Sequence, residues 1–129
     1  MVDYRSLLGR RWQYGVNDCY SLLRDFYKCM GVELPDFPRP ACLDKSHSIF
    51  LRHAKEIGFY QISFLDKGFG DVFIMNLGTD HPNHAGIYVG DMRMIHQRQG
   101  SLSAETGLAS YYIESIAAVF RYGANRSAT

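Results

Sequence analysis

Cys19 stands where turn-forming residues give way to a periodic apolar stretch, and it is the residue best placed to do chemistry. Either Asn17 or Asp18 can cap a helix that begins there, because both side chains accept hydrogen bonds from otherwise free backbone N–H groups. Those N–H groups and the positive end of the helix dipole stabilise a thiolate, so we expect the pKa of Cys19 to be lowered. A thiol of this kind is a nucleophile for acyl transfer.

Two histidines supply the other groups that a cysteine nucleophile needs. His84 and His96 lie in two predicted strands, residues 84–89 and 93–97. The Gly90-Asp91 pair between them can form a tight turn, and antiparallel pairing across it predicts that the two imidazoles are neighbours. We expect His84 to act as the general base, because an unperturbed histidine titrates near neutral pH, and His96 to orient the His84 ring.

The first half of the chain is predicted to be helical. The expected elements are a short turn around residues 4–8, a helix over residues 18–30 ended by Gly31, and a helix over residues 46–57 ended by Gly58. A proline-rich extended connection, residues 33–40, separates the two longer helices. The N-terminus of the first long helix therefore has to carry the nucleophile.

The second half is predicted to consist of short strands between glycines and polar clusters. These strands cover residues 71–77, 84–89, 93–97 and 116–121. Sequential hairpins favour an antiparallel sheet, and helices ahead of strands favour an α+β fold. We expect one catalytic domain over residues 1–123 and a frayed tail over residues 124–129. The loops at residues 37–44 and 100–111 carry no pattern from which specificity can be predicted.

Composition narrows the class of protein. The chain has 129 residues, of which 47% are hydrophobic, enough for a core of ordinary size. Its 14 basic and 13 acidic residues are mixed along the sequence and leave a net charge of +1, which argues against binding to nucleic acid or to an anionic membrane. We find neither a secretory signal pattern nor a membrane-spanning apolar run, so we expect synthesis in a cytoplasm and no membrane insertion.

The remaining cysteines have plainer interpretations. Ten residues of helix separate Cys29 from Cys19 by about 15 Å, too far for a disulfide. We expect Cys29 to be a small buried hydrophobe, while Cys42 has no assigned role. A lone cysteine more often packs than reacts, and it is the pair of histidines that favours catalysis at Cys19.

The remaining histidines do not indicate a metal site. His47 and His53 lie in a predicted helix without a partner motif and are expected at the surface or in packing. A zinc site could use Cys19 together with His81, His84 and His96, whose side chains suit zinc. The closely spaced ligand pairs of structural zinc sites are missing, so no metal or cofactor is expected.

Taken together, the motifs resemble those of the NlpC/P60 cell-wall peptidases, a family of papain-like cysteine hydrolases. The matching segments, in the order in which they occur in the family, are Trp12-Gln13-Tyr14-Gly15, Asp18-Cys19, Gly31-Val32-Glu33-Leu34-Pro35, Gly70-Asp71-Val72-Phe73, His84-Ala85-Gly86-Ile87-Tyr88-Val89-Gly90 and Ile95-His96. The resemblance implies the papain-like NlpC/P60 fold, in which N-terminal helices pack on an antiparallel sheet.

The resemblance also implies an activity and further site residues. It implies that Cys19, with His84 and His96, cleaves a peptide bond of the peptidoglycan stem, next to D-glutamate or diaminopimelate. A family tyrosine that helps to hold the oxyanion aligns with Trp12, and Tyr14 is the nearest substitute with a hydroxyl. Tyr20 stands where the family commonly has serine, and is expected to narrow the cleft or to reshape the pocket beside the sulfur.

Within the family, the segments Asp18-Cys19-Tyr20-Ser21-Leu22 and Ile116-Ala117-Ala118-Val119-Phe120-Arg121-Tyr122 are similar to those of phage tail-assembly proteins. This similarity implies a tail-tip hydrolase whose partners are the peptidoglycan stem peptide and other tail proteins. Transport in the virion tail would bring a protein made in the host cytoplasm to the cell wall in the periplasm. Two alternatives remain open: a structural tail-assembly subunit with little or no catalysis, and a thiol amidase or acyltransferase that acts on a substrate outside the wall.

Overall fold

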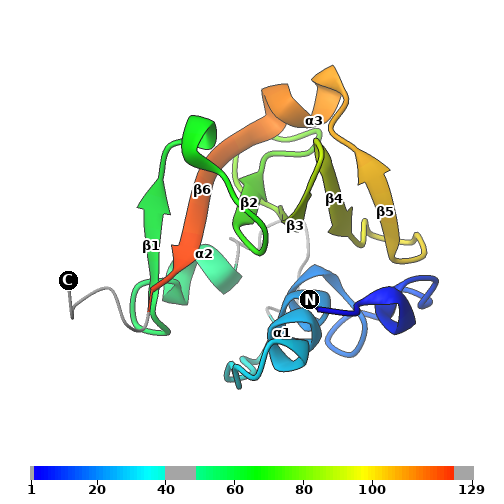
Figure 1. Ribbon diagram of the computed structural model, residues 1–129. Coiled ribbons are helices and arrows are strands. Elements are labelled where there is room, and N and C mark those ends of the chain that lie inside the picture. The colour runs from blue at the N-terminus through cyan, green and yellow to red at the C-terminus, as the bar shows by residue number, and fades with distance from the viewer. Residues whose placement is uncertain (1, 40–48, 124–129) are drawn as a thin grey trace.

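A six-stranded antiparallel sheet forms the centre of the computed structural model, which describes residues 2–39 and 49–123 (Figure 1). The strand order is β1-β6-β2-β3-β4-β5. The strands are β1 (Phe59–Ile62), β2 (Val72–Met75), β3 (His84–Gly90), β4 (Arg93–His96), β5 (Ala104–Gly107) and β6 (Ile116–Tyr122). The helices are η1 (Arg5–Leu7), α1 (Cys19–Cys29), α2 (Ile49–His53), η3 (Phe64–Asp66) and α3 (Ser110–Ser115). The predicted α+β class is confirmed.

Helix α1 forms where the sequence predicts it, and for the predicted reasons. Asp18 is its N-cap, and the carboxylate accepts a hydrogen bond from the Ser21 N–H at 2.9 Å. Gly31 follows the helix with a φ of +84°, a conformation that glycine adopts without a steric penalty. Because both ends are fixed by local signals, the first residue of the helix, Cys19, has a defined place.

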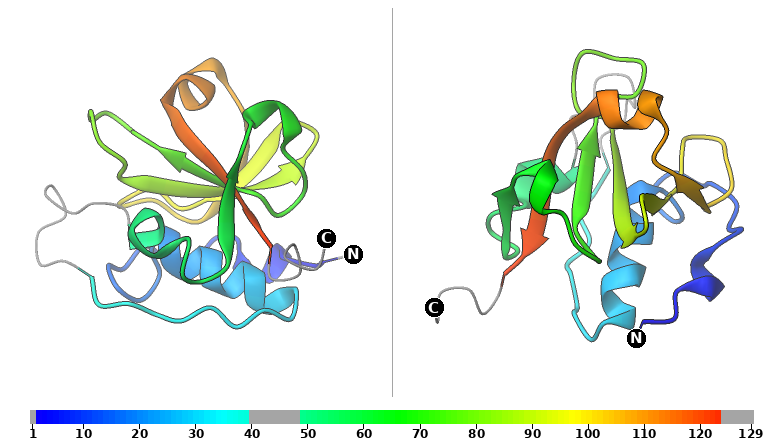
Figure 2. Two further views of the ribbon diagram at one scale, coloured as in Figure 1. Left: turned by 90° about the vertical axis from the view of Figure 1, so that its left-hand side faces the viewer. Right: turned by 45° about the horizontal axis from the view of Figure 1, so that its top comes forward.

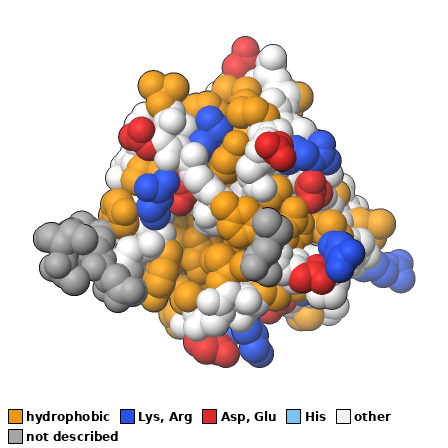
Figure 3. Space-filling view, in the orientation of Figure 1, with side chains coloured by type: hydrophobic (Ala, Val, Ile, Leu, Met, Phe, Trp, Pro, Cys, Tyr) orange, Lys and Arg blue, Asp and Glu red, His pale blue; other side chains and the backbone are white. Residues whose placement is uncertain are grey.

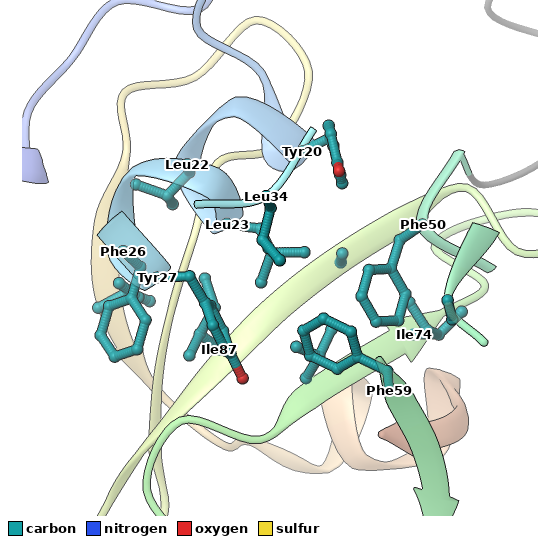
Figure 4. Packing of buried hydrophobic residues seen from close by; sticks show 14 of the residues in the cluster. Tyr20, Leu22, Leu23, Phe26, Tyr27, Leu34, Phe50, Phe59, Ile74 and Ile87 are labelled. Carbon is teal, nitrogen blue, oxygen red and sulfur yellow. The ribbon is translucent and has the colours of Figure 1, made fainter. Parts of the chain in front are cut away.

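The apolar side of α1 packs on one face of the sheet. Side chains at positions three and four apart, among them Leu23, Phe26 and Tyr27, are buried, as helical periodicity requires. Figure 4 shows them beside Ile87 of β3, with the aromatic rings of α2 and β1 completing the cluster. The contact with β3 is what brings the start of α1 near the strand that carries His84.

The opposite face of the sheet is also covered. Phe73, Met75 and Met94 point to that side and are fully buried, and Tyr112 of α3 packs against the same cluster. Figure 2 shows α1 and α3 on opposite sides of the sheet. Since both faces are buried, the central strand β2 is apolar at every position instead of alternating.

The hairpin between β3 and β4 differs from the prediction by one residue. Its two turn residues are Asp91 and Met92, both with positive φ (53° and 56°), so the predicted Gly90-Asp91 turn is wrong. An irregularity in the pairing between Tyr88 and Gly90 accompanies the shift, and Gly86 lies opposite His96. A turn centred on Gly90-Asp91 would have put Ala85 opposite His96, with His84 and His96 on different faces of the sheet.

Other elements differ from the predicted ones in extent. The four predicted strands are found, but β1 and β5 were not predicted by range, and the supposed loop at residues 100–111 contains β5 and the start of α3. In β5, buried and exposed residues do not alternate and no residue is buried, so this strand lacks the usual pattern of a strand with one buried face. Helix α2 ends at His53, before a series of turns to Gly58, and the first predicted residues of this helix lie outside the described ranges.

Four other residues of the sequence analysis lie away from the proposed catalytic residues in the sequence or fall outside the described ranges. Cys29 is exposed at the end of α1, so the expectation that it is buried is wrong. His53 stacks on Phe37, with ring centroids 3.8 Å apart, and pairs with Glu56. Cys42 and His47 lie outside the described residues.

The surface is mixed in charge. On the face seen in Figure 1, acidic and basic side chains are interspersed around a central group of hydrophobic ones (Figure 3). Across the described ranges, no helix has both the length and the apolar character needed to cross a membrane.

Candidate active site

The thiol of Cys19 lies at the junction of α1 and β3. Cys19 is the first residue of α1 and is only partly exposed. Its sulfur lies beside two backbone N–H groups, those of Ala85 and Tyr20. Ala85 immediately follows His84 in β3, so the fold brings the predicted nucleophile to the start of the strand that carries the predicted base.

The electrostatic environment of the thiol is the reverse of what the sequence predicts. Burial raises the pKa of Cys19 to about 11, and the neighbouring Asp18 carboxylate adds to this effect. The N–H groups of Ala85 and Tyr20 and the charge of Arg39 act in the other direction but do not overcome it. The predicted lowering of the Cys19 pKa is therefore wrong for the free protein, because the cost of desolvating a thiolate exceeds the stabilisation at the helix N-terminus.

The two predicted histidines are in contact. His84 Nε2 and His96 Nδ1 are 2.9 Å apart, and the two rings meet at 72°. Both residues are buried, with 5% and 3% of their surfaces exposed. Gly86 lies opposite His96, and a Cβ atom at this position would lie 2.9 Å from the Met94 sulfur and 3.1 Å from the Met75 methyl carbon, so the packing on this face of the sheet leaves room only for glycine. Because Nε2 of His84 is bonded to His96, Nδ1 is the nitrogen through which His84 can exchange a proton with a substrate or a thiol.

Burial also keeps both imidazoles neutral. It lowers the pKa of His84 to about 3, with further contributions from the charges of His96 and Arg98. It lowers the pKa of His96 to about 4, again with a contribution from Arg98. The thiol and the two rings are therefore uncharged at neutral pH, and an uncharged imidazole can accept a proton.

A buried ion pair fixes the residue that precedes the thiol. The guanidinium of Arg39 donates to both carboxylate oxygens of Asp18, at 2.8 Å and 3.1 Å, and to the Ser21 hydroxyl at 3.0 Å. The side chains of Arg39 and Asp18 are 6% and 8% exposed. Burial alone would raise the pKa of Asp18, but the hydrogen bonds from Arg39, Ser21 and Gly15 bring it below its usual range. The capping carboxylate is thus charged and paired.

Three aromatic residues close to Cys19 in the sequence are Trp12, Tyr14 and Tyr20. Trp12 and Tyr14 stack on each other at a centroid distance of 6.2 Å, at the tight turn that precedes α1. Tyr20 is buried, and its hydroxyl donates to the Pro35 carbonyl at 2.6 Å. Its ring packs against Phe37, so Tyr20 joins α1 to the extended connection through a hydroxyl that is already engaged.

Sequence reasoning missed two residues of this region. Arg39 lies 21 residues after Asp18, in a segment whose prolines indicated only an extended chain. Thr106 of β5 lies 3.0 Å from His96 Nε2 through its Oγ1 atom. Neither has a local sequence signal, because each is defined by a partner that only the fold brings close.

The residues considered for zinc do not gather around a common point. His84 and His96 direct ring nitrogens at each other, and His81 lies in the loop before β3, where it pairs with Asp80. In residues 2–39 and 49–123, no three His, Cys, Asp or Glu side chains are grouped so that they could hold a metal ion.

Comparison with known proteins places this geometry in a family. The NlpC/P60 family model matches residues 9–121. Tail tip assembly protein K of Escherichia phage lambda is 39% identical over 98 residues, which cover 75% of this chain and 49% of the relative. The protein of the same name from Escherichia phage N15 is 27% identical over 126 residues, covering 90% of this chain and 49% of the relative. The chain spans about half the length of these two relatives.

Solved structures support the same fold. NlpC1 from Trichomonas vaginalis superposes with a TM-score of 0.65 and 18% identity over 92% of this chain and 41% of its own. A lipoprotein-like NLP/P60 family protein from Staphylococcus aureus gives a TM-score of 0.64 and 19% identity over 92% of this chain and 38% of its own. At these identities the likeness concerns the fold alone. With the family model matching residues 9–121, a span that includes Cys19, His84 and His96, the chain belongs to the NlpC/P60 family.

Proposed function

We propose that the chain is a cysteine hydrolase that cleaves peptide bonds of peptidoglycan stem peptides as part of a phage tail tip. The observation that carries the proposal is the hydrogen bond between His84 and His96, at the start of a strand whose Ala85 N–H lies beside the Cys19 sulfur. The bond engages Nε2 of His84, and we assign its Nδ1 as the base nitrogen. We assign Cys19 as the nucleophile, because members of the NlpC/P60 family are typically cysteine peptidases. The names of the two phage relatives favour the tail tip as its setting.

The chemistry follows from the uncharged resting state. The Cys19 thiol transfers its proton to His84 Nδ1 as the sulfur attacks the substrate carbonyl carbon. The backbone N–H of Cys19, at the start of the helix, is a donor for the resulting oxyanion. His84 returns the proton to the leaving nitrogen, the C–N bond breaks, and a thioester and an amine result. Water then hydrolyses the thioester to a carboxylic acid and regenerates the thiol.

In this proposal, the protein is made in the host cytoplasm, travels in the virion tail and acts on the wall from the periplasm. Its partners are the stem peptide and other tail proteins. The roles of Trp12 and Tyr14 at the oxyanion remain part of the proposal. Tyr14 has the hydroxyl that Trp12 lacks, and their stacking keeps both next to the turn that leads into α1.

The test is digestion of purified peptidoglycan, with products identified by mass spectrometry. We expect new amines from the wild-type protein and none from Cys19→Ala. Cys29→Ala is the matched control, since it removes an exposed thiol from the other end of the same helix and should keep full activity. Equal cleavage by wild type and Cys19→Ala would place the nucleophile elsewhere.

A structural role in tail assembly is the second candidate, and the names of the two relatives favour it specifically. It predicts that phage carrying Cys19→Ala assemble normal tails and that the wild-type protein cleaves no wall peptide. A third outcome, cleavage of simple amides or transfer to amines without cleavage of wall peptides, would identify an amidase or acyltransferase.

A further inference from the structure

A third polar side chain continues the hydrogen-bond chain beyond the two histidines. His96 Nε2 lies 3.0 Å from Thr106 Oγ1. In the pairing of β4 with β5, Thr106 is opposite Met94, two residues before His96. Thr106 and His96 are therefore diagonal neighbours on one face of the sheet, a spacing that side chains can bridge. The His96 ring is held at both nitrogens, by His84 and by Thr106.

The surroundings of His96 limit what else can take the place of this hydroxyl. His96 is 3% exposed. The ring of Tyr112 meets it nearly at a right angle, with centroids 5.1 Å apart. Because the ring is enclosed, a partner lost at Nε2 is not simply replaced by bulk water.

We propose that Thr106 is a positioning residue that fixes which nitrogen of His96 carries the proton. In this proposal, its hydroxyl oxygen accepts the Nε2–H of His96 and does not donate its own hydrogen to that nitrogen, which keeps the Nδ1 lone pair of His96 directed at His84. The consequence for catalysis rests on the proposed function, whereas the tautomer itself does not. Thr106 makes no contact with the nucleophile in this scheme and acts through His96.

The reason lies in the proton count of the pair. When His84 takes the thiol proton at Nδ1, its ring carries hydrogens on both nitrogens, and Nε2–H must donate to His96. His96 can accept only if its own hydrogen is on Nε2, and that hydrogen then needs an acceptor, which Thr106 supplies. In the other tautomer, His96 donates to His84, so the hydrogen of the neutral His84 ring sits on Nδ1 and the ring cannot take a proton from the thiol.

The first experiment is nitrogen NMR of protein with ¹⁵N-labelled histidine, with the His96 signals assigned from their loss in His96→Gln. We expect hydrogen on Nε2 of His96 in the wild type and in Thr106→Ser, which keeps the hydroxyl. Thr106→Val removes the hydroxyl at similar volume and should add a population with hydrogen on Nδ1. Hydrogen on Nδ1 of His96 in the wild type would overturn the proposal, even if no variant could be purified.

The second experiment measures turnover of a wall peptide by the same variants. We expect Thr106→Val to lower kcat about tenfold or more with little change in KM, and Thr106→Ser to restore most of it. Ser103→Ala controls for general loss of stability, because it removes a buried hydroxyl that is bonded to the backbone of Arg10 and Leu7 and not to His96. Equal loss in Thr106→Ser and Thr106→Val would overturn the positioning role. If the wild type cleaves nothing, the proposed function fails while the NMR result still decides the tautomer.

Discussion

Removing Arg39 is expected to destabilise the protein strongly, because it would leave the charge of Asp18 buried without its partner. The two side chains are 6% and 8% exposed and share two hydrogen bonds. Breaking a buried ion pair by deleting one partner costs about 3–5 kcal/mol. We therefore expect Arg39→Met to lower the free energy of unfolding by about that amount. Asp18 would keep its bonds from Ser21 and Gly15, which places the effect at the lower end of this range.

The assay is urea unfolding followed by circular dichroism, applied to a double-mutant cycle. Combining Arg39→Met with Asp18→Asn removes both charges, and an asparagine still caps a helix well. The double variant should therefore be more stable than Arg39→Met alone. Arg5→Met is the matched control, since Arg5 pairs with Asp3 at the surface, where the two side chains are 85% and 63% exposed. Its unfolding midpoint should not change.

The pH dependence provides a second check on the same pair. The pKa of Asp18 is lower in the folded protein than in the unfolded chain, where it is about 3.9. The pair therefore contributes stability that is fully present above that value and is lost as the pH falls through the folded pKa. Arg39→Met should lose less stability on acidification than the wild type. Additive losses in the cycle, or a loss below about 1 kcal/mol in Arg39→Met, would refute the account of a desolvated pair.

Three further predictions concern the thiol, the histidines and the space between strands. In a variant without other cysteines, iodoacetamide should alkylate Cys19 at a rate that rises about tenfold per pH unit between pH 7 and 10, because its pKa is about 11. A rate that is already at its plateau near pH 7 would show that the thiol is ionised there. Because the folded pKa values of His84 and His96 lie below the unfolded value of about 6.5, the unfolded chain binds more protons below that pH. Stability should therefore fall on acidification from pH 6.5 to 5 by about 2 kcal/mol for each ring, less so in His96→Gln, as measured by urea unfolding. Gly86→Ala places a Cβ atom 2.9 Å from the Met94 sulfur and should cost about 1–3 kcal/mol in unfolding free energy, whereas an unchanged melting temperature would mean that the methionine moves freely.

Elements with signals in their own sequence were predictable. Asp18 and Gly31 mark the ends of α1, and the apolar residues between them have helical spacing, so the helix and the place of Cys19 follow from a short stretch of chain. The strands that carry His84 and His96 are likewise rich in large apolar residues. Their contact was expected, although the turn assumed for it was displaced by one residue.

Features that depend on distant partners were not predictable. Whether His84 and His96 share a face depends on the Asp91-Met92 turn and the irregularity beside it, which propensities do not fix. The pKa of Cys19 was predicted in the wrong direction because helix position is a local property, whereas burial is set by the sheet that packs against it. Thr106 lies in a strand with no buried residue, and only its neighbour on β4 gives it a role.

The two-residue turn between β3 and β4 also restricts how the length of this chain can vary. Inserting or deleting one residue there changes which residues face each other, and so sends one imidazole to the side of the sheet where α1 packs. In the loop at residues 76–83, between β2 and β3, the Asn83 side chain bonds to the Leu77 backbone and holds the two ends of the loop together. A change of length between those two residues therefore leaves the pairing of β2 with β3 as it is. Insertions and deletions among relatives should therefore accumulate in that loop and be absent from the Asp91-Met92 turn.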